Sequence, residues 1–426
     1  MKNITETVYK LYCEASPLGL IGEESTTETE VALRQIRETT SNLDFEVVGR
    51  EYEVSEILKL VIDSTDEHDM SVISIVGMGG LGKTTLAKMI FNHDIIKQHF
   101  DKTIWVCVSK PFIVMKILEE IFQGLMNTYS GLNSKEALLK RLREEMKGKR
   151  YFLVLDDVWD KEQGLWDDLS CCLKQIAGKS GNSIMVTTRS VEVATMVKAI
   201  SIHHLKKLSD DQCWVLFKKS ANANQLSMSS KVKMVKNVLV RKMGGVPLVA
   251  KVLGGAVNFE EDFGGDYENW MTKVESIARN ISKEDKDFVL SILKLSVDSL
   301  PLLALKQCFT YCSNFPQDYN FQKEELIRMW IAQGFIQPQH ERENLIMEDI
   351  GEEYFNYLLS RSLFQDANKN VNGRIVTFKM HDLIHDIACT FSNHQKMEPN
   401  PNNWSGKSTR NLRTLIRDDE EIHNKI

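Results

Sequence analysis

The sequence lacks the patterns that direct a chain into or across a membrane. Its apolar runs stay well below the length of about eighteen residues that a membrane-spanning helix requires. Residues 1–11 have neither the basic nor the apolar region of a secretory signal peptide. The eight cysteines are scattered, without a Cys-x2-Cys pair. We therefore expect a cytoplasmic protein with reduced thiols and no membrane span.

A surplus of positive charge is also missing. Lys and Arg total 53 against 59 Asp and Glu, for a formal net charge of −6. This balance carries no electrostatic footprint of nucleic-acid binding, and we expect no nucleic-acid partner. With 426 residues, of which 42% are hydrophobic and 26% charged, the chain is long enough for several compact globular units.

The most informative run is Gly77–Thr85, which reads Gly-Met-Gly-Gly-Leu-Gly-Lys-Thr-Thr and fits the Gly-x4-Gly-Lys-Ser/Thr pattern. A β-branched run, Ser71–Val76, precedes it, and a helical stretch, Leu86–Phe91, follows. The glycines let backbone N–H groups point into one concavity, and the helix N-terminus adds positive potential there. The run predicts a phosphate-binding loop in which Lys83 reaches the outer phosphates and the Thr84 hydroxyl supplies a magnesium ligand.

Apolar strand-like runs alternate with amphipathic helical stretches from about residue 46 to residue 205. The candidate strands are Val72–Val76, Thr103–Val108, Tyr151–Leu155 and Ser183–Thr187. Alternation of this kind predicts an α/β domain with a parallel, doubly wound sheet and a ligand at the carboxyl ends of its strands.

Changes in composition and in apolar periodicity along the chain predict further domain boundaries. We expect a linker or the remnant of an N-terminal helical domain at 1–45, a P-loop nucleotide-binding domain at 46–205, a helical domain at 206–283, a winged-helix domain at 284–390 and a polar tail at 391–426. The winged-helix prediction comes from helical periodicity up to Tyr357, followed by a hairpin that pairs Leu363–Asp366 with Arg374–Met380.

Two candidate strands end in charged residues. Phe152–Leu155 leads to Asp156 and Asp157, and a phosphate-binding loop needs an acid at the tip of a neighbouring strand to hold magnesium. We expect Asp156 to bind the metal and Asp157 to orient an attacking water. Another strand leads to Arg189, which can stabilise charge on a terminal phosphate; a solvated strand-end arginine is the alternative.

The repeated His-Asp near the end of the third domain has several interpretations. His381 and His385 lie four apart on one helical face, which invites a zinc site. The zinc-protease pattern, however, requires Glu where Asp382 stands, and no third ligand is evident nearby. A hydrogen-bonded residue at a helix start is a simpler role for His381, but it leaves the repetition unexplained. The remaining interpretation is that His381 contacts the nucleotide from the third domain.

Taken together, the motifs resemble the NB-ARC domain of plant intracellular immune receptors, the nucleotide-binding leucine-rich-repeat (NLR) disease resistance proteins. They run in family order and spacing from about residue 47 to residue 390. The matching segments are Val47–Glu51, the phosphate loop, Phe100–Ser109, Leu155–Trp159, Ile184–Arg189, Gly245–Leu248, Cys308–Ser313, Phe315–Pro316, Trp330 and Met380–Asp382. Trp159 after the paired acids resembles the coiled-coil class.

The resemblance implies a P-loop domain of the STAND ATPase type, a small helical domain (ARC1-like) and a winged-helix domain (ARC2-like), closed around ADP at rest and bound to ATP when active. The resemblance also implies a role for each site residue. The adenine or ribose would lie near Val48, Arg50, Pro247 and Leu248, and the phosphates would be held by Gly77, Met78, Gly79, Gly80, Leu81, Gly82, Lys83, Thr84 and Thr85. Mg2+ would be bound by Thr84 and Asp156, and hydrolysis would involve Asp157, Lys83 and Arg189, of which Arg189 would sense the terminal phosphate of ATP. His381 would contact the β-phosphate of ADP. Asp382 would support the closed form, and the winged helix would be a moving lid.

The sequence also departs from the family pattern. Residues 1–45 are too short for the usual coiled-coil domain, and the chain stops at 411–426, where leucine-rich repeats would begin. A pathogen effector or host guardee would be sensed through those missing repeats, and self-association would follow activation. The alternatives are a regulatory or decoy fragment that associates with full-length receptors without switching, and, as an enzyme, at most a slow ATPase whose hydrolysis resets the switch.

Overall fold

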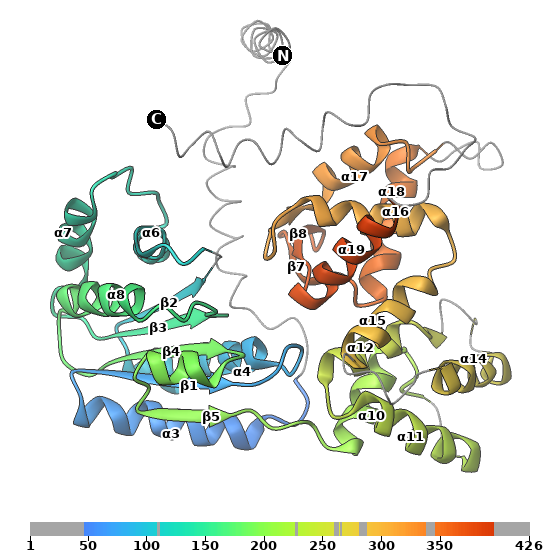
Figure 1. Ribbon diagram of the computed structural model, residues 1–426, viewed down its shortest axis with the longest axis horizontal. Helices are drawn as coiled ribbons and strands as arrows, with labels where there is room; N and C mark the ends of the chain where they lie inside the picture. Colours follow the sequence, from blue (N-terminus) through green and yellow to red (C-terminus); the bar gives the residue numbers. More distant parts are fainter. Residues whose placement is uncertain are drawn as a thin grey trace, which may run out of the picture.

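The computed structural model describes residues 47–108, 111–225, 229–259, 264, 266–280, 288–337 and 346–395. An α/β half with a parallel sheet lies beside a largely helical half that carries a small antiparallel sheet (Figure 1). The arrows of the parallel strands point toward the helical half, so their carboxyl ends face it. The predicted segment 1–45 and most of the predicted tail lie outside the described residues.

The parallel sheet contains the four predicted strands, each within two residues of the expected bounds. Its strands are β1 (Met70–Val76), β2 (Lys102–Cys107), β3 (Tyr151–Asp156), β4 (Asn182–Thr188) and β5 (Ser201–His204), in the order β2-β3-β4-β1-β5. β1, β3 and β4 are almost wholly buried, as expected for near-continuous apolar runs covered on both faces. The sequence analysis named no strand at β5, because Ser-Ile-His-His offers neither an apolar run nor a regular alternation.

Helices cover both faces of this sheet, which confirms the doubly wound α/β prediction. One face carries α3 (Glu51–Glu67), α4 (Lys83–Phe91) and α5 (Asp94–His99), and the other carries α6 (Val114–Met126), α7 (Lys135–Met146), α8 (Gln163–Ile176) and α9 (Val191–Met196). Side chains of β4 alternate between the two cores. Ile184 and Val186 pack with α6–α9, whereas Met185 packs with α3–α5.

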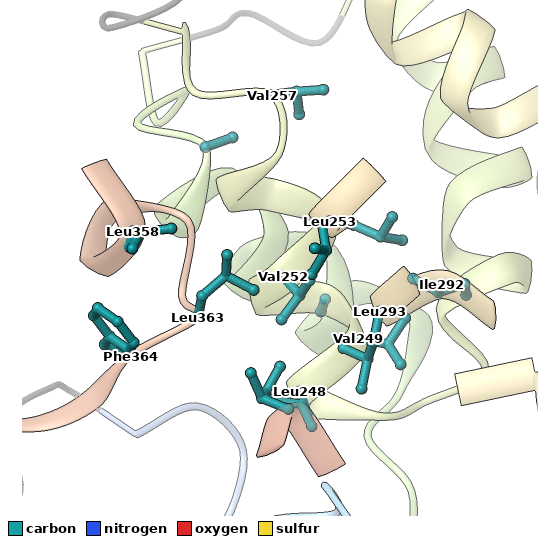
Figure 2. Packing of buried hydrophobic residues seen from close by; sticks show 14 of the residues in the cluster. Leu248, Val249, Val252, Leu253, Val257, Ile292, Leu293, Leu358, Leu363 and Phe364 are labelled. Atoms are coloured by element: carbon teal, nitrogen blue, oxygen red, sulfur yellow. The ribbon is translucent and has the colours of Figure 1, made fainter. Parts of the chain in front are cut away.

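The helical half begins with α10 (Asp210–Ser220), α11 (Ser230–Met243), α12 (Pro247–Gly255) and α14 (Tyr267–Asn280). It continues with α15 (Phe288–Asp298), α16 (Leu303–Tyr311), the 3-10 turn η2 (Cys312–Asn314), β6 (Phe321–Gln322), α17 (Lys323–Ala332), α18 (Met347–Ser360), β7 (Gln365–Lys369), β8 (Ile375–Lys379) and α19 (Asp382–Gln395). A single hydrophobic cluster runs through all of it. Figure 2 shows Val252 and Leu253 of α12 beside Leu293 and Leu363, which come from the predicted third domain.

The predicted hairpin is present as β7 and β8, which we call the wing hairpin. Gln365 pairs with Lys379 and Lys369 with Ile375, and β6 completes a sheet of order β6-β8-β7. The first strand begins two residues later than expected, at Gln365, and ends at Lys369, three residues beyond the expected end at Asp366. None of the helices that the structure describes is both long and apolar enough to cross a bilayer.

Candidate nucleotide-binding site

The predicted phosphate loop joins the carboxyl end of β1 to the first turn of α4. Gly80 and Gly82 adopt φ values of +73° and +93°, a left-handed conformation that favours glycine, and α4 starts at Lys83. The Lys83 Nζ donates to the Met78 carbonyl at 3.2 Å, so the side chain folds back over the loop. Burial lowers the pKa of Lys83 to about 8, against the opposing pull of the Asp157 carboxylate.

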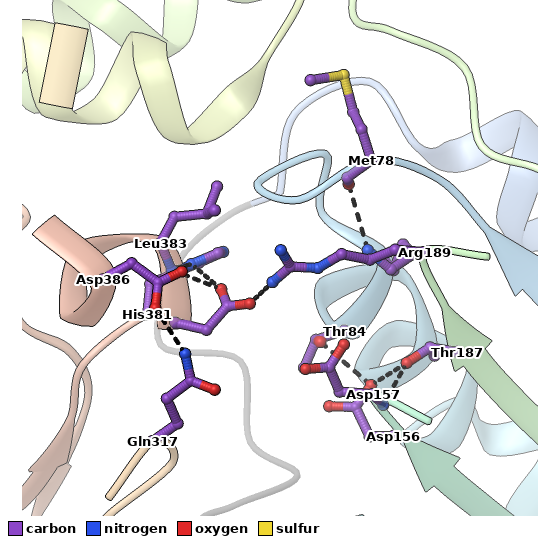
Figure 3. A network of polar contacts seen from close by, with 12 residues as sticks. Met78, Thr84, Asp156, Asp157, Thr187, Arg189, Gln317, His381, Leu383 and Asp386 are labelled. Carbon is purple, nitrogen blue, oxygen red and sulfur yellow. Dashed lines mark hydrogen bonds and ion pairs between the residues drawn. The ribbon is translucent and has the colours of Figure 1, made fainter. Parts of the chain in front are cut away.

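Asp156 lies at the carboxyl end of β3, within reach of the loop. Its Oδ1 accepts hydrogen bonds from the hydroxyls of Thr84 at 3.1 Å and Thr187 at 2.5 Å, and the Thr187 hydroxyl accepts from the Asp157 N–H at 2.8 Å (Figure 3). Burial raises the pKa of Asp156 to about 6, although both hydroxyls oppose the rise.

The strand order corrects one step of the sequence analysis. β3 does not neighbour β1, because β4 lies between them. The intervening strand therefore adds Thr187, whose hydroxyl bonds the Asp156 carboxylate and the Asp157 backbone N–H. Thr187 was not among the candidate residues. The signal for it was present: a hydroxyl residue at a strand end, two positions before Arg189.

The two groups predicted to hold Mg2+ converge in the structure. The Thr84 hydroxyl and the Asp156 carboxylate are within hydrogen-bond distance of each other. Both are hard oxygen donors of the type that Mg2+ takes in nucleotide sites. These residues therefore fit the ion.

Arg189 follows β4 and extends over the loop. Its guanidinium makes an ion pair with Asp382 of α19 and lies 4.2 Å from the centroid of the Trp159 ring. A Cβ added to Gly79 would stand 3.0 Å from Nη1 of Arg189, a tight contact that would require the guanidinium to shift. The Nε of Arg189 is buried and has no hydrogen-bond partner among the residues that the structure describes, which leaves a donor for an anion.

The third domain supplies His381 and Leu383 at the same place (Figure 3), and Asp382 pairs with Arg189 there. The His381 Nδ1 lies 2.5 Å from the Asp382 carboxylate. Burial, together with the charges of Arg189 and Lys83, lowers the pKa of His381 to about 3, so the imidazole is neutral at neutral pH. The Leu383 side chain lies against the loop, 3.0 Å from the position of a Gly79 Cβ.

The helical domain holds the loop from another side. The backbone N–H of Leu248, in the first turn of α12, donates to the Gly80 carbonyl at 3.2 Å. A Cβ on Gly80 would stand 2.9 Å from the Leu248 Cβ. Pro247 is the first residue of α12, where its missing N–H leaves no helical hydrogen bond unmade.

Arg50 anchors the loop to the start of α3. Its guanidinium is buried and donates to the Leu81 carbonyl at 3.0 Å and the Lys206 carbonyl at 2.9 Å, and it pairs with Glu53 at 2.9 Å. Val48 lies half-buried two residues earlier. The structure thus shows Arg50 bracing the loop, and its predicted place near adenine stays a prediction.

His385 has a role separate from that of His381. Its Nε2 donates to the Phe315 carbonyl at 2.8 Å, and its Nδ1 lies 3.7 Å from the Cys389 thiol. Asp386 accepts a hydrogen bond from the Gln317 amide at 2.8 Å. The second His-Asp of the repeat therefore ties α19 to the segment after η2, while the first faces the loop.

Comparison with known proteins agrees with this arrangement. Residues 50–227 match the NB-ARC domain family, and residues 315–388 match the disease resistance protein winged helix domain family. The disease resistance protein RGA2 of Solanum bulbocastanum is 40% identical over 355 residues, which cover 83% of this chain and 35% of that protein. The putative disease resistance RPP13-like protein 1 of Arabidopsis thaliana is 33% identical over 395 residues, or 91% of this chain and 35% of that protein.

Among solved structures, a STAND protein with a tetratricopeptide-repeat sensor from Pyrococcus horikoshii aligns with 91% of this chain and 47% of its own. The TM-score is 0.50 and the identity is 16%, so the likeness concerns the fold. The chain spans about a third of the length of the curated relatives named above. The chain belongs to the plant disease resistance protein family, and the part of that family which it covers comprises an NB-ARC nucleotide-binding domain and a disease resistance winged-helix domain.

Proposed function

We propose that the chain is an ADP/ATP-dependent switch of an intracellular plant immune receptor, with ADP bound in the closed arrangement and ATP in the active one. The observation that carries the proposal is the contact of three domains with one phosphate-binding loop. Leu248 reaches it from the helical domain, Arg189 from the α/β domain, and Leu383 from the winged-helix domain. A ligand on this loop would touch all three, so its affinity would differ between closed and open arrangements.

Each part of the site would have its own role. Gly77–Thr85 would hold the phosphates, and Thr84 and Asp156 would hold Mg2+, whose chemistry is to neutralise phosphate charge. Lys83 would contact the outer phosphates and Asp157 would orient water for slow, resetting hydrolysis. The base and ribose would lie near Val48, Arg50, Pro247 and Leu248, and the β-phosphate near His381.

Arg189 would distinguish the two nucleotides. In the closed arrangement its guanidinium neutralises Asp382, whose side chain is 9% exposed. A terminal phosphate would compete with Asp382 for this cation and leave the carboxylate buried without its partner. Losing one partner of a buried ion pair costs about 3–5 kcal/mol. Moving a two-state equilibrium from 1:99 to 99:1 requires about 5.5 kcal/mol, so this single exchange would supply much of the difference.

The test is to purify the folded chain, denature it and identify any released nucleotide by chromatography. We expect near-stoichiometric ADP. Lys83→Arg should be nearly empty, because a planar guanidinium does not replace a compact ammonium at the phosphates. Asp382→Asn should retain less ADP, because Arg189 loses its counter-ion in the closed arrangement.

Asp386→Asn is the matched control, since that carboxylate lies one turn further along α19 and bonds Gln317 within its own domain. It should retain ADP as the native chain does. A native chain that is folded but empty, or equal ADP content in the native chain and in the Lys83 and Asp382 variants, would refute the switch.

The cellular role is proposed from the relatives. As members of the disease resistance family act in defence, we propose a cytoplasmic receptor that senses a pathogen effector or a host guardee through further repeats and self-associates on activation. The winged helix would act as a lid and not as a reader of DNA. No observation in the site or among the relatives supports the alternative of a decoy fragment that never switches.

A further inference from the structure

A second ion pair crosses between the two halves of the molecule, away from the phosphate loop. Lys88 belongs to α4, one turn after Thr84, and its Nζ lies 3.0 Å from the Asp366 Oδ1 of the wing hairpin. The two residues are 278 positions apart in the sequence. The Lys88 side chain is only 7% exposed. Because a buried ammonium without a counter-charge is strongly unfavourable, Lys88 depends on this carboxylate.

The backbone of the wing hairpin presents Asp366 in an unusual conformation. Asp366 has φ +50°, in the left-handed region, and it lies where the register of β7 with β8 shifts, between Gln365 and Asn368. Asp tolerates this conformation better than most residues. The irregularity thus coincides with the one carboxylate of β7.

Asp366 stands among cations of both halves. Besides its bond to Lys88, it acts on Lys379 of β8: burial lowers the pKa of that ammonium, while the charges of Cys107, Asp318 and Asp366 together raise it above its ordinary value. The pair therefore joins the wing hairpin to α4, the helix that follows the phosphate loop.

We propose that Lys88 and Asp366 form an autoinhibitory latch, which ties the wing hairpin to the P-loop helix in the closed arrangement and is separate from the Arg189–Asp382 contact. When the hairpin moves away, water solvates both charges. When only Asp366 is neutralised, the closed arrangement traps an unpaired ammonium and opens. The inference rests on the proposed switch, because a latch regulates a protein only if its domains separate.

The test is a double-mutant cycle in the full chain with Lys88→Met, Asp366→Asn and both together. Asn keeps the left-handed backbone and removes only the charge, while Met keeps the apolar stem of Lys88. Release of a fluorescent ADP analogue is followed after a chase with unlabelled ADP. Hydrogen exchange of the amides of α4 and β8 reports opening without reference to nucleotide.

We expect Asp366→Asn to release the analogue about tenfold faster than the native chain, the scale of a lost charge-assisted hydrogen bond. Lys88→Met should have a smaller effect, because Asp366 is 35% exposed and stays hydrated. The double variant should resemble Lys88→Met alone. The matched control is Lys135→Met with Asp168→Asn, an ion pair of 2.6 Å inside the α/β half, which should leave release unchanged.

Native release and native exchange in an Asp366→Asn chain that holds the analogue would overturn the latch and leave the switch standing. Strictly additive effects in the double variant would overturn it as well. If no chain binds the analogue, the proposed switch fails, and hydrogen exchange alone then decides whether the pair holds the halves together. Should Asp366→Asn fail to fold, the comparison of Lys88→Met with the native chain decides by the same two readouts.

Discussion

At the scale of single residues, the site depends on charges that are shared between domains. Arg189 pairs with Asp382 and lies over Trp159, while its Nε has no hydrogen-bond partner in the described part of the chain. His381 beside it stays neutral, because burial and two nearby cations oppose its protonation. The same cluster thus offers a cation and a neutral imidazole to a ligand.

The neutral His381 predicts a specific pH dependence. Its pKa is about 3 in the closed chain and about 6.5 when exposed, so the closed chain binds fewer protons between these values. Above pH 6.5 the neutral His381 does not lower the free energy of unfolding. Below pH 6.5 it lowers this free energy by about 1.4 kcal/mol for each unit by which the pH falls. Asp156 acts the other way: its pKa of about 6 lies above its exposed value, so acid stabilises that part of the fold.

Comparing the native chain with a variant of His381 cancels the contribution of Asp156 to the pH dependence of stability, because Asp156 is present in both chains. Native chain and His381→Asn are unfolded with urea at pH 7 and at pH 5. Asn retains a donor toward Asp382 but does not titrate. We expect the native chain to lose more stability than the variant on acidification, by about 1–2 kcal/mol. Equal losses would show that the pKa of His381 is not lowered in the folded chain.

At the scale of elements, the helical half depends on how closely α12 approaches the end of α18. Gly255 is in contact with the backbone at Arg361, and the Arg361 Nη1 donates to the Gly255 carbonyl at 2.6 Å. A Cβ on Gly255 would stand 2.7 Å from the Arg361 carbonyl carbon. The α12–α18 approach therefore requires glycine at this position.

Gly255→Ala should destabilise the chain by about 1–3 kcal/mol, as overpacking of a rigid contact does. The matched control is Gly164→Ala in the first turn of α8, where an added Cβ meets nothing within 4 Å. There alanine should be neutral or stabilising by up to about 1 kcal/mol. Urea unfolding of both variants checks this, and equal midpoints would contradict the packing argument.

At the scale of the whole molecule, the α/β half has two separate cores and the helical half has one, and Leu81 of the α/β half and Leu248 of the helical half bring two of these cores to the phosphate loop. Among the described residues, no hydrophobic core spans the interface between the halves. The ion pairs Arg189–Asp382 and Lys88–Asp366 join the halves there, together with the contacts of Leu248 and Leu383 with the phosphate loop. A ligand at this interface would then join the halves.

Saturating ADP with Mg2+ should therefore raise the unfolding temperature of the entire chain. At one hundred times Kd the stabilisation is about 2.7 kcal/mol for a ligand that binds only the folded form. Calorimetry should show the transitions of the two halves drawn together in the native chain. Lys83→Arg should show neither effect, and a shift of the α/β half alone would mean that ADP does not bridge the halves.

Local chemistry let the sequence alone predict much of this protein. The glycines of the loop, the buried strands β1, β3 and β4, the acids after β3 and the wing hairpin all follow from patterns within about ten residues. The conformational freedom of glycine and the periodicity of apolar side chains act over that range. The site roles carried over from the family stay predictions, although the structure brings Thr84, Asp156, Arg189 and His381 together at one loop.

Only the tertiary structure decided what lies across the chain. The insertion of β4 between β3 and β1 brought Thr187 to Asp156, and β5 formed from a segment with no strand pattern of its own. The pairs Arg189–Asp382 and Lys88–Asp366 depend on how the winged-helix domain docks on the sheet. A single charged residue has no periodicity, so its partner is determined by strand order and domain packing rather than by its neighbours in sequence.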